Sequence, residues 1–401
     1  MKPLSTKALQ IKESSTLAIT AKAKELAAFG ENLIAFTAGE PDFDTPEHIK
    51  EAAIDAAREG FTKYTPTQGI IELRKAVCAK LKNDNGLSYE PSQIVVSNGA
   101  KHALSNIFAA LLCDGDEVII PAPYWLTYPE LVTLSGGVSK YVYADAASGY
   151  KPTAKQIREA VTDKTKAILI NSPNNPSGAV YGKDELEAIA QIAVTNDLYV
   201  ISDEIYEKLI YNDATPHISI ASLGEEILKR TIVVNGYSKS YAMTGWRVGY
   251  TASNKDIAKV MANIQSHQTS NINTLAQKAA IAAETGEKEN IENMRQAFKR
   301  RKALMHGMIS KIPGVKSANP DGAFYIFADI SGLIGKKTKC GIITNAADFA
   351  EFILNEQKLA LVPCADFGCK NHIRLSYACS EAAIAEGMER LEEFVHNLGN
   401  A

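Results

Sequence analysis

The amino-acid sequence predicts an α/β protein, with a mainly parallel central sheet in a large domain and a second, smaller α+β domain. Between residues 93 and 251, short β-rich runs alternate with helical stretches, a rhythm typical of parallel strands covered by helices. After Thr251 the character changes to long helical stretches that are followed by strands. The chain has 401 residues, 46% of them apolar, which is enough to bury the cores of two domains.

The strands expected in the large domain are short and apolar. They are Gln93–Ser97, Glu117–Ile120, Lys166–Asn171, Leu198–Asp203 and Thr231–Asn235. Several of them end in a polar or turn residue that is followed by loop-forming residues. Because open α/β sheets place their ligand sites beyond the carboxyl ends of the strands, we expect the chemistry of this protein to gather there.

After Thr251 we expect long helical stretches over roughly Thr274–Ser310, followed by strands over Ala323–Phe327 and His372–Ser376 in the smaller domain. The chain has no Gly/Ser-rich or Pro-rich linker, so the long helical stretch is the expected connection between the domains. We therefore place the large domain at residues 46–290 and the small domain at residues 1–45 and 291–401.

Composition and charge exclude several classes of function. The formal net charge is -3 without a basic stripe, so no nucleic-acid partner is expected. No run is long and apolar enough to cross a bilayer, and the start of the chain lacks a secretory signal, which predicts a cytoplasmic protein with no membrane partner. The 6 cysteines show no paired CxxC spacing and are expected to be reduced thiols. Cys364, Cys369 and His372 match no zinc pattern, so no metal is expected.

Lys239 and Arg247 stand eight residues apart across a turn that follows an apolar strand. Two cations placed in this way suit a phosphorylated ligand. A lysine among apolar and cationic neighbours loses proton affinity and becomes a nucleophile that can form a Schiff base with an aldehyde. A guanidinium group offers a planar fork to phosphate oxygens. Either residue alone is equally consistent with an exposed, solvated charge.

Asp203 ends the apolar run over residues 198–202. A carboxylate at the end of a buried strand needs a cationic partner. A protonated pyridine nitrogen would be such a partner, and the carboxylate would keep that ring positive, as the stabilisation of a carbanion requires. A helix N-cap is the alternative role for this aspartate.

Two loops after predicted strands are candidate ligand loops. In Ser97–Leu104 a glycine turn leads into a helical pattern, whose first backbone N–H groups can hold a phosphate. This loop fits neither GxxxxGK[ST] nor GxGxxG, so a plain strand-to-helix turn is the alternative. In Asn171–Gly178 two prolines and a glycine set a stiff turn that positions the amide of Asn175. A polar surface turn is the alternative there.

Trp125 and Arg374 complete the candidate site. Trp125 follows a predicted strand, and its indole ring would lie against an aromatic ligand, although a lone tryptophan is more often part of a core. Arg374 alternates with apolar residues in a predicted strand, where it would bind a substrate carboxylate with two hydrogen bonds. A charge on an exposed face of the strand is the alternative.

Taken in order over nearly the whole chain, these motifs resemble the class I aminotransferases of the pyridoxal-phosphate fold type I superfamily. Thr37–Pro46, Lys63–Pro66 and Asn171–Gly178 are similar to the bacterial aspartate aminotransferase subgroup Ib. The resemblance implies pyridoxal 5'-phosphate as the cofactor, a homodimer with shared active sites, and reversible amino transfer between aspartate or glutamate and 2-oxoglutarate or oxaloacetate. Some members of the subgroup also convert prephenate to arogenate.

The resemblance also implies a role for each residue around the cofactor ring. Lys239 would form the Schiff base and then move the proton between the substrate α-carbon and the cofactor, which requires a pKa near neutrality. Asp203 would pair with the pyridine nitrogen. Tyr206 and Asn175 would bond the ring hydroxyl, and Trp125 would stack on the ring.

For the phosphate, the resemblance implies a surrounding set of Gly99, Ala100, Lys101, Ser238 and Arg247. Tyr64 would reach the phosphate of the neighbouring subunit, so that each site depends on the dimer. Some branches of the family have a serine where this chain has Gly236, and Ser238 is expected to take over that contact.

For the substrate, the resemblance implies contacts from Gly39, Trp125, Asn175, Arg374 and Lys12. Arg374 and the backbone of Gly39 would hold the α-carboxylate. Lys101 resembles the cation that this subgroup uses for the distal carboxylate. Lys12, with Ser15 and Thr16, stands where a lysine linked to prephenate turnover would be, and a solvated lysine on an N-terminal helix is the alternative.

Other functions stay open at this point. An aromatic or alanine aminotransferase, or a lyase such as aminocyclopropane-carboxylate synthase, would keep the same cofactor. A non-catalytic binding or regulatory protein on the same fold is a different class, since fold does not imply function. A nicotinamide-dependent enzyme would also suit alternating strands and helices, but the chain lacks the GxGxxG fingerprint.

Overall fold

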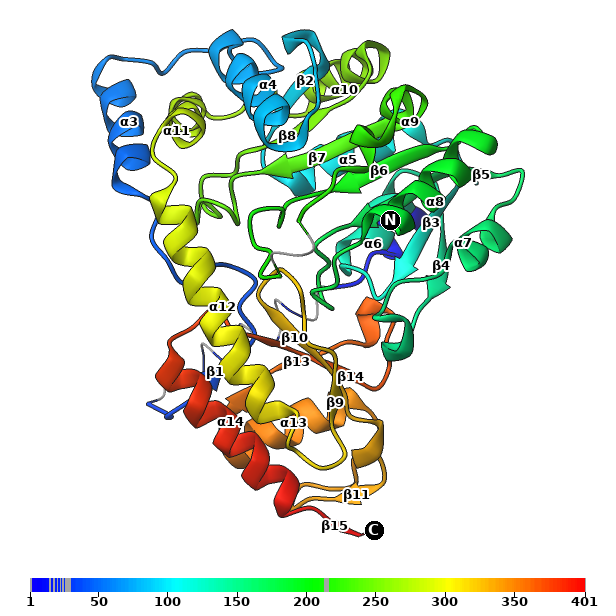
Figure 1. Ribbon diagram of the computed structural model, residues 1–401, viewed down its shortest axis with the longest axis vertical. Coiled ribbons are helices and arrows are strands. Elements are labelled where there is room, and N and C mark those ends of the chain that lie inside the picture. The colour runs from blue at the N-terminus through cyan, green and yellow to red at the C-terminus, as the bar shows by residue number, and fades with distance from the viewer. Residues whose placement is uncertain are drawn as a thin grey trace.

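The computed structural model describes residues 2–13, 16, 19, 21, 23, 25, 30–212 and 216–400. Figure 1 shows a large sheet with its helices in the upper part of the view and a smaller sheet with helices α13 and α14 in the lower part. Helix α12 (Glu289–Ile309), drawn in yellow, runs from one part to the other. Among the helices that are described, none is long and apolar enough to span a membrane.

The large sheet has seven strands in the order β2-β8-β7-β6-β5-β3-β4. The strands are β2 (Ile94–Ser97), β3 (Glu117–Ala122), β4 (Val138–Tyr143), β5 (Thr165–Asn171), β6 (Tyr199–Asp203), β7 (Thr231–Gly236) and β8 (Gly249–Ala252). Only β8 runs antiparallel to its neighbours, so the predicted mainly parallel sheet is confirmed. The five predicted strands are all present, each within a few residues of the expected bounds.

Helices cover both faces of this sheet, which explains why its central strands are apolar throughout. On β5, Ala167 and Leu169 pack with helices α5, α6 and α10, while Ile168 and Ile170 pack with α7, α8 and α9 on the opposite face. The helices of this part are α3 (Glu47–Arg58), α4 (Ile71–Asn85), α5 (Ala100–Leu111), α6 (Thr127–Leu134), α7 (Ala154–Ala160), α8 (Lys183–Thr195), α9 (Glu225–Arg230), α10 (Lys255–Gln268) and α11 (Thr274–Thr285).

The helical stretches predicted over 274–310 are present as two helices, α11 and α12, with a break between them. Gly286 follows α11 in an extended conformation. The ammonium group of Lys288 donates to the backbone oxygens of Ala283 and Glu284 at 2.6 and 2.9 Å, and so caps the end of α11. The chain therefore changes direction before α12 begins.

The lower part contains a four-stranded antiparallel sheet in the order β13-β14-β10-β9. Its strands and helices are β9 (Lys316–Ser317), β10 (Tyr325–Asp329), β13 (Val362–Pro363), β14 (His372–Ser376), α13 (Ala346–Gln357) and α14 (Glu381–His396). The predicted strand over 323–327 begins two residues later, because Ala323 has a φ of 58° and still belongs to a turn. The predicted strand over 372–376 is confirmed.

Two pairs of short strands complete this lower part. Strand β1 (Ile34–Ala35) pairs in parallel with β12 (Leu359–Ala360), and β11 (Lys336–Lys337) pairs with β15 (Gly399–Asn400). Helix α1 (Thr6–Leu9) lies elsewhere, against α6, where Lys7 pairs with Asp114 at 2.6 Å. The domain boundaries given above stay a prediction.

Candidate active site

A cavity of about 780 Å³ opens at the carboxyl ends of β5, β6 and β7, where the sequence placed the chemistry. Its lining also includes residues of the segment over 35–40 and of strands β10 and β14 from the smaller sheet. Of the residues predicted to act together, the structure brings Gly39, Ala100, Lys101, Trp125, Asn175, Asp203, Tyr206, Ser238, Lys239, Arg247 and Arg374 to this one cavity.

Lys239 follows β7, and its side chain extends to the segment over 35–40. Its Nζ donates to the backbone oxygen of Gly39 at 2.6 Å. Burial lowers the pKa of Lys239 to about 8, and the positive charges of Arg374 and Arg247 act in the same direction, against Glu40. About a tenth of the amine is then neutral at pH 7, far more than for an ordinary lysine, which makes this lysine a nucleophile and a proton acceptor.

Asp203 ends β6 with its side chain only 3% exposed. Burial raises the pKa of this carboxyl group to about 6, although hydrogen bonds from the Tyr128 hydroxyl and the Ile205 N–H lower it. No cation of the described residues forms an ion pair with Asp203. The carboxylate therefore lines the cavity with a charge that a cationic ligand would balance.

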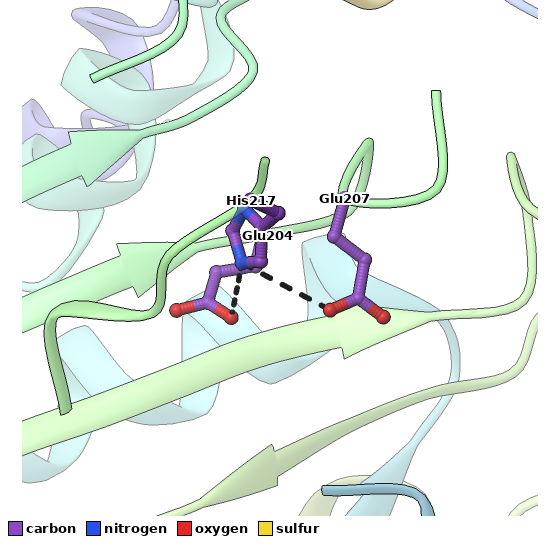
Figure 2. A group of neighbouring side chains, drawn as sticks. All are labelled: Glu204, Glu207 and His217. Carbon is purple, nitrogen blue, oxygen red and sulfur yellow. Dashed lines mark hydrogen bonds and ion pairs between the residues drawn. The ribbon is translucent and has the colours of Figure 1, made fainter. Parts of the chain in front are cut away.

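Directly after Asp203, a buried network fixes the chain that carries Tyr206. Figure 2 shows His217 between the carboxylates of Glu204 and Glu207, and its Nε2 lies 3.0 and 3.9 Å from their oxygens. Glu204 also accepts from two serine hydroxyls, and Glu207 pairs with the ammonium group of Lys80. These bonds satisfy both carboxylates and place a positive charge beside them, so the network serves as an anchor rather than as a cation site.

Arg374 projects from β14 and is 3% exposed. Its Nη1 donates to the side-chain oxygen of Asn175 at 3.0 Å, and its Nη2 donates to the backbone oxygen of Thr37 at 3.2 Å. The guanidinium carbon lies 4.3 Å from the ring centroid of Tyr325. Its buried Nε has no hydrogen-bond partner among the described residues. A buried donor in this state calls for an acceptor from a ligand.

Asn175 is held in its loop by a hydrogen bond from its own backbone. The loop follows β5, and the backbone N–H of Asn175 donates to Oδ1 of Asn171 at 2.9 Å. The same Asn171 donates to the backbone oxygen of Asp203 at 3.0 Å. One asparagine at the end of β5 therefore holds two of the predicted site residues in place.

The opposite end of the cavity suits an anion. Gly99 precedes helix α5 with a φ of 82°, and a Cβ at this position would lie 2.4 Å from Nη2 of Arg247. Glycine is therefore required where the arginine crosses the start of the helix. Ala100 and Ser238 line the cavity close by, and burial together with Arg247 lowers the pKa of Lys101. Lys101 also lies 5.1 Å from the centroid of the Trp125 ring.

The charges of the described lining residues are unbalanced. The cations Lys101, Lys239, Arg247 and Arg374 face the carboxylates Glu40 and Asp203. The excess of positive charge favours a ligand with more than one anionic group.

Among the predicted residues, Gly99 is not part of the cavity lining but lies next to Ala100, which is, and Tyr64 and Lys12 lie elsewhere. The side chain of Tyr64 is 90% exposed. Lys12 lines a separate small pocket beside Tyr124 and Asp366, and its backbone N–H donates to Glu130 at 3.3 Å. Thr16 does line the main cavity, whereas Ser15 falls outside the described residues.

Gly236 on β7 is the register partner of Gly249 on β8. A Cβ at this position would be 2.9 Å from the Cα of Gly249 and from the backbone oxygen of Val248. A serine therefore does not fit at position 236, and the hydroxyl that lines the cavity belongs to Ser238.

Sequence reasoning missed several residues that complete the site. Tyr128 donates to Asp203 at 2.7 Å, and the hydroxyls of Tyr206 and Tyr325 lie 2.9 Å apart. Tyr128 lies in the first turn of α6, three residues after Trp125, and this nearness to a predicted site residue is the one sequence signal for it. Tyr325 comes from β10, and no local pattern links it to the large domain.

Comparisons with known proteins agree with this site. The family model for aminotransferase class I and II matches residues 31–391. An aspartate aminotransferase of Bacillus sp. (strain YM-2) is 50% identical over 382 residues, which cover 95% of this chain and 96% of the relative. A probable aspartate/prephenate aminotransferase of Aquifex aeolicus is 46% identical over 399 residues, with 99% and 100% covered.

Solved structures of aspartate aminotransferases also resemble this chain over nearly its whole length. The aspartate aminotransferase from Rhizobium meliloti superposes with a TM-score of 0.95 at 38% identity and covers 100% of both chains. The aspartate aminotransferase from Thermus thermophilus with maleate superposes with a TM-score of 0.92 at 43% identity and covers 98% of this chain and 100% of the other. The chain therefore belongs to the class I and II aminotransferases, and it is a pyridoxal-phosphate-dependent transaminase that acts on amino acids and keto acids.

Proposed function

We propose that this protein transfers amino groups reversibly between aspartate or glutamate and 2-oxoglutarate or oxaloacetate. The observation that carries the proposal is the buried guanidinium of Arg374, whose Nε lacks a partner among the described residues in the cavity of Lys239. Such a group suits the α-carboxylate that these amino acids and keto acids share. Lys101 lines the same cavity and offers a second cation for the distal carboxylate.

The residues present fit pyridoxal 5'-phosphate. Asp203 is buried without an ion-pair partner among the described residues, and cations gather around the glycine at the start of α5. We propose that Lys239 holds the aldehyde carbon, Asp203 the ring nitrogen, Tyr206 and Asn175 the ring hydroxyl, Trp125 the ring face, and Gly99, Ala100, Lys101, Ser238 and Arg247 the phosphate. When bound, the cofactor supplies an electron sink for the carbanion at the substrate α-carbon.

The protein's own contribution is to bind, orient and move a proton. Arg374 and the backbone of Gly39 hold the α-carboxylate, which fixes the α-carbon near Lys239. With its pKa lowered to about 8, Nζ of Lys239 can accept the α-proton and return it. The hydroxyl of Tyr325 lies 2.9 Å from that of Tyr206 and can donate to it, so that Tyr206 keeps its own proton for the ring hydroxyl.

One preparation tests the core of this proposal. The purified protein should carry a yellow cofactor that borohydride fixes to Lys239, and it should use aspartate with 2-oxoglutarate. Pyruvate and aromatic keto acids, offered as acceptors to the same enzyme, separate this activity from that of an alanine or aromatic aminotransferase. A protein without the chromophore, or with the label on another lysine, would refute the proposal.

The proposed assembly is a homodimer in which Tyr64 completes the partner's phosphate site. Tyr64 is 90% exposed and lies outside the cavity of its own chain, which supports a contact with a second subunit. Tyr64→Ala and Lys239→Ala chains are each expected to be nearly inactive as homodimers. After mixing, each hybrid dimer holds one site with both residues intact, and hybrids make up about half of a statistical mixture, so about a quarter of the wild-type activity per active site should return. Mixtures that stay inactive would contradict the shared site.

Prephenate is the second candidate acceptor. Relatives from Aquifex aeolicus and Thermus thermophilus, 46% and 43% identical over at least 99% of this chain, are named probable aspartate/prephenate and aspartate/prephenate aminotransferase. We propose that Lys12 supports this activity. Lys12 lines a separate pocket of its own chain, and Thr16, which follows it in the same segment, lines the main cavity. Lys12→Ala should lower prephenate turnover selectively, and Lys7→Ala serves as a control in the same segment. An unchanged ratio of prephenate to oxaloacetate turnover would contradict this role.

A further inference from the structure

The carboxylate of Asp203 receives a hydrogen bond on each of its two oxygens. The Tyr128 hydroxyl donates to Oδ2 at 2.7 Å, and the backbone N–H of Ile205 donates to Oδ1 at 3.3 Å. The bond from Ile205 is local and comes with the turn after β6. The bond from Tyr128 is shorter and spans 75 residues of the chain. The side chain of Tyr128 therefore constrains the orientation of the carboxylate from outside its own loop.

Tyr128 has no room to point elsewhere. Its side chain is 1% exposed, and its ring meets the ring of Trp125 edge-on, with centroids 5.4 Å apart and an interplanar angle of 89°. The backbone N–H of Tyr128 donates to the oxygen of Trp125 at 3.0 Å. The turn that leads into helix α6 thus supplies both an aromatic ring for the cavity, from Trp125, and a fixed donor for Asp203, from Tyr128. The donor is oriented before any ligand arrives.

The hydroxyl bond favours one protonation state of Asp203. Burial raises the pKa of Asp203 to about 6, and the bonds from Tyr128 and Ile205 oppose that rise. An ionised carboxylate only accepts hydrogen bonds, so a fixed donor stabilises the charged form. Burial also raises the pKa of Tyr128 well above its ordinary value, which keeps its hydroxyl a donor.

We propose that Tyr128 is a positioning residue that keeps Asp203 ionised and oriented towards the ring nitrogen of the cofactor. The inference rests on the proposed function, in which Asp203 pairs with that nitrogen. A proton shared between the nitrogen and the carboxylate stays on the nitrogen as long as Tyr128 lowers the basicity of Asp203. Without the hydroxyl, the proton moves towards Asp203, and the ring loses part of the positive charge that makes it an electron sink.

The test uses the full-length holoenzyme with a cofactor isotope-labelled at its ring nitrogen. Nitrogen NMR at neutral pH reports how far this atom is protonated. Fluorescence titration of the cofactor-free protein gives the dissociation constant of pyridoxal 5'-phosphate. Tyr128→Phe should move the nitrogen resonance from the pyridinium position towards that of neutral pyridine and raise the dissociation constant about tenfold. Tyr150→Phe is the control, because Tyr150 is another buried tyrosine, whose hydroxyl lies 3.2 Å from His372.

The outcomes separate this inference from the proposed function. Asp203→Asn should displace the resonance further than Tyr128→Phe does. If Asp203→Asn displaces it and Tyr128→Phe leaves it at the wild-type position, the role of Tyr128 is overturned while that of Asp203 stands. If Asp203→Asn has no effect, the pairing of Asp203 with the nitrogen fails and this inference fails with it. An equal displacement in Tyr150→Phe would show a general packing effect and would also overturn the proposal.

A second replacement covers the case in which Tyr128→Phe does not fold. Replacing Tyr128 by 4-aminophenylalanine keeps the shape of the ring and substitutes a weaker donor for the hydroxyl. The nitrogen resonance should then move in the same direction as in Tyr128→Phe but by a smaller amount. A resonance at the wild-type position in this variant would contradict the proposal.

Discussion

Replacing Arg374 by lysine is expected to lower kcat/KM about 30- to 1000-fold, because the charge stays but the planar fork is lost. In the structure the arginine is 3% exposed and already donates to Asn175 and Thr37. Hydrogen bonds to charged groups contribute about 1.5 to 3 kcal/mol each. Losing one such bond and misplacing another costs about 2 to 4 kcal/mol, and each 1.36 kcal/mol corresponds to a factor of ten in rate.

The assay follows oxaloacetate release from aspartate in a coupled reaction with malate dehydrogenase, at varied aspartate and varied 2-oxoglutarate. Both substrates carry an α-carboxylate, so the apparent KM should rise for both. Cofactor absorbance and thermal melting confirm that the variant is loaded and folded. Arg300→Lys is the matched control, since Arg300 has a side chain that is 66% exposed and lies outside the cavity. A loss of less than about threefold in Arg374→Lys at full cofactor loading would refute the reasoning.

Three further predictions test other parts of the site and its support. In cofactor-free protein, acylation of Lys239 should rise with pH to half of its maximum near pH 8, because burial favours the neutral amine, and an inflection above about pH 9.5 would contradict this. Gly99→Ala should weaken cofactor binding at least about tenfold, because its Cβ would lie 2.4 Å from Arg247, whereas Gly60→Ala has a similar φ and no atom within 4 Å and should bind normally. Lys80→Met should lower the free energy of unfolding in urea by about 3 to 5 kcal/mol, because it leaves Glu207 without its buried cation. Lys208→Met should cost at most about 1 kcal/mol, because Lys208 and its partner Asp84 are partly exposed, and equal losses would refute the account.

The sequence predicted the large sheet well because its central strands are buried on both faces. Runs such as the one over 166–171 contain little but apolar residues, and the polar residues that end them mark the edge where the cavity opens. Asn171 and Asp203 are register partners on β5 and β6 and lie together there. The local sequence pattern and the parallel topology were therefore enough to predict that these two residues lie together in the site.

The parts that sequence reasoning missed depend on contacts between distant segments. The break between α11 and α12 is stabilised by a lysine side chain that folds back onto the preceding carbonyls, and helical periodicity carries no sign of that bond. Tyr128 and Tyr325 look like ordinary core aromatics in sequence. Their hydroxyl partners lie 75 and 119 residues away, so only the folded chain shows what they bond.

Residues 37–40 contact both the arginine proposed to bind the substrate carboxylate and the lysine proposed to react with the cofactor. The oxygen of Thr37 accepts from Arg374, and the oxygen of Gly39 accepts from Lys239. Glu40 accepts from Thr244 at 2.7 Å and opposes the lowering of the pKa of Lys239. A shift of this backbone would disturb carboxylate recognition and lysine reactivity together. Substrate range is therefore hard to change along this stretch without also changing the reactivity of Lys239.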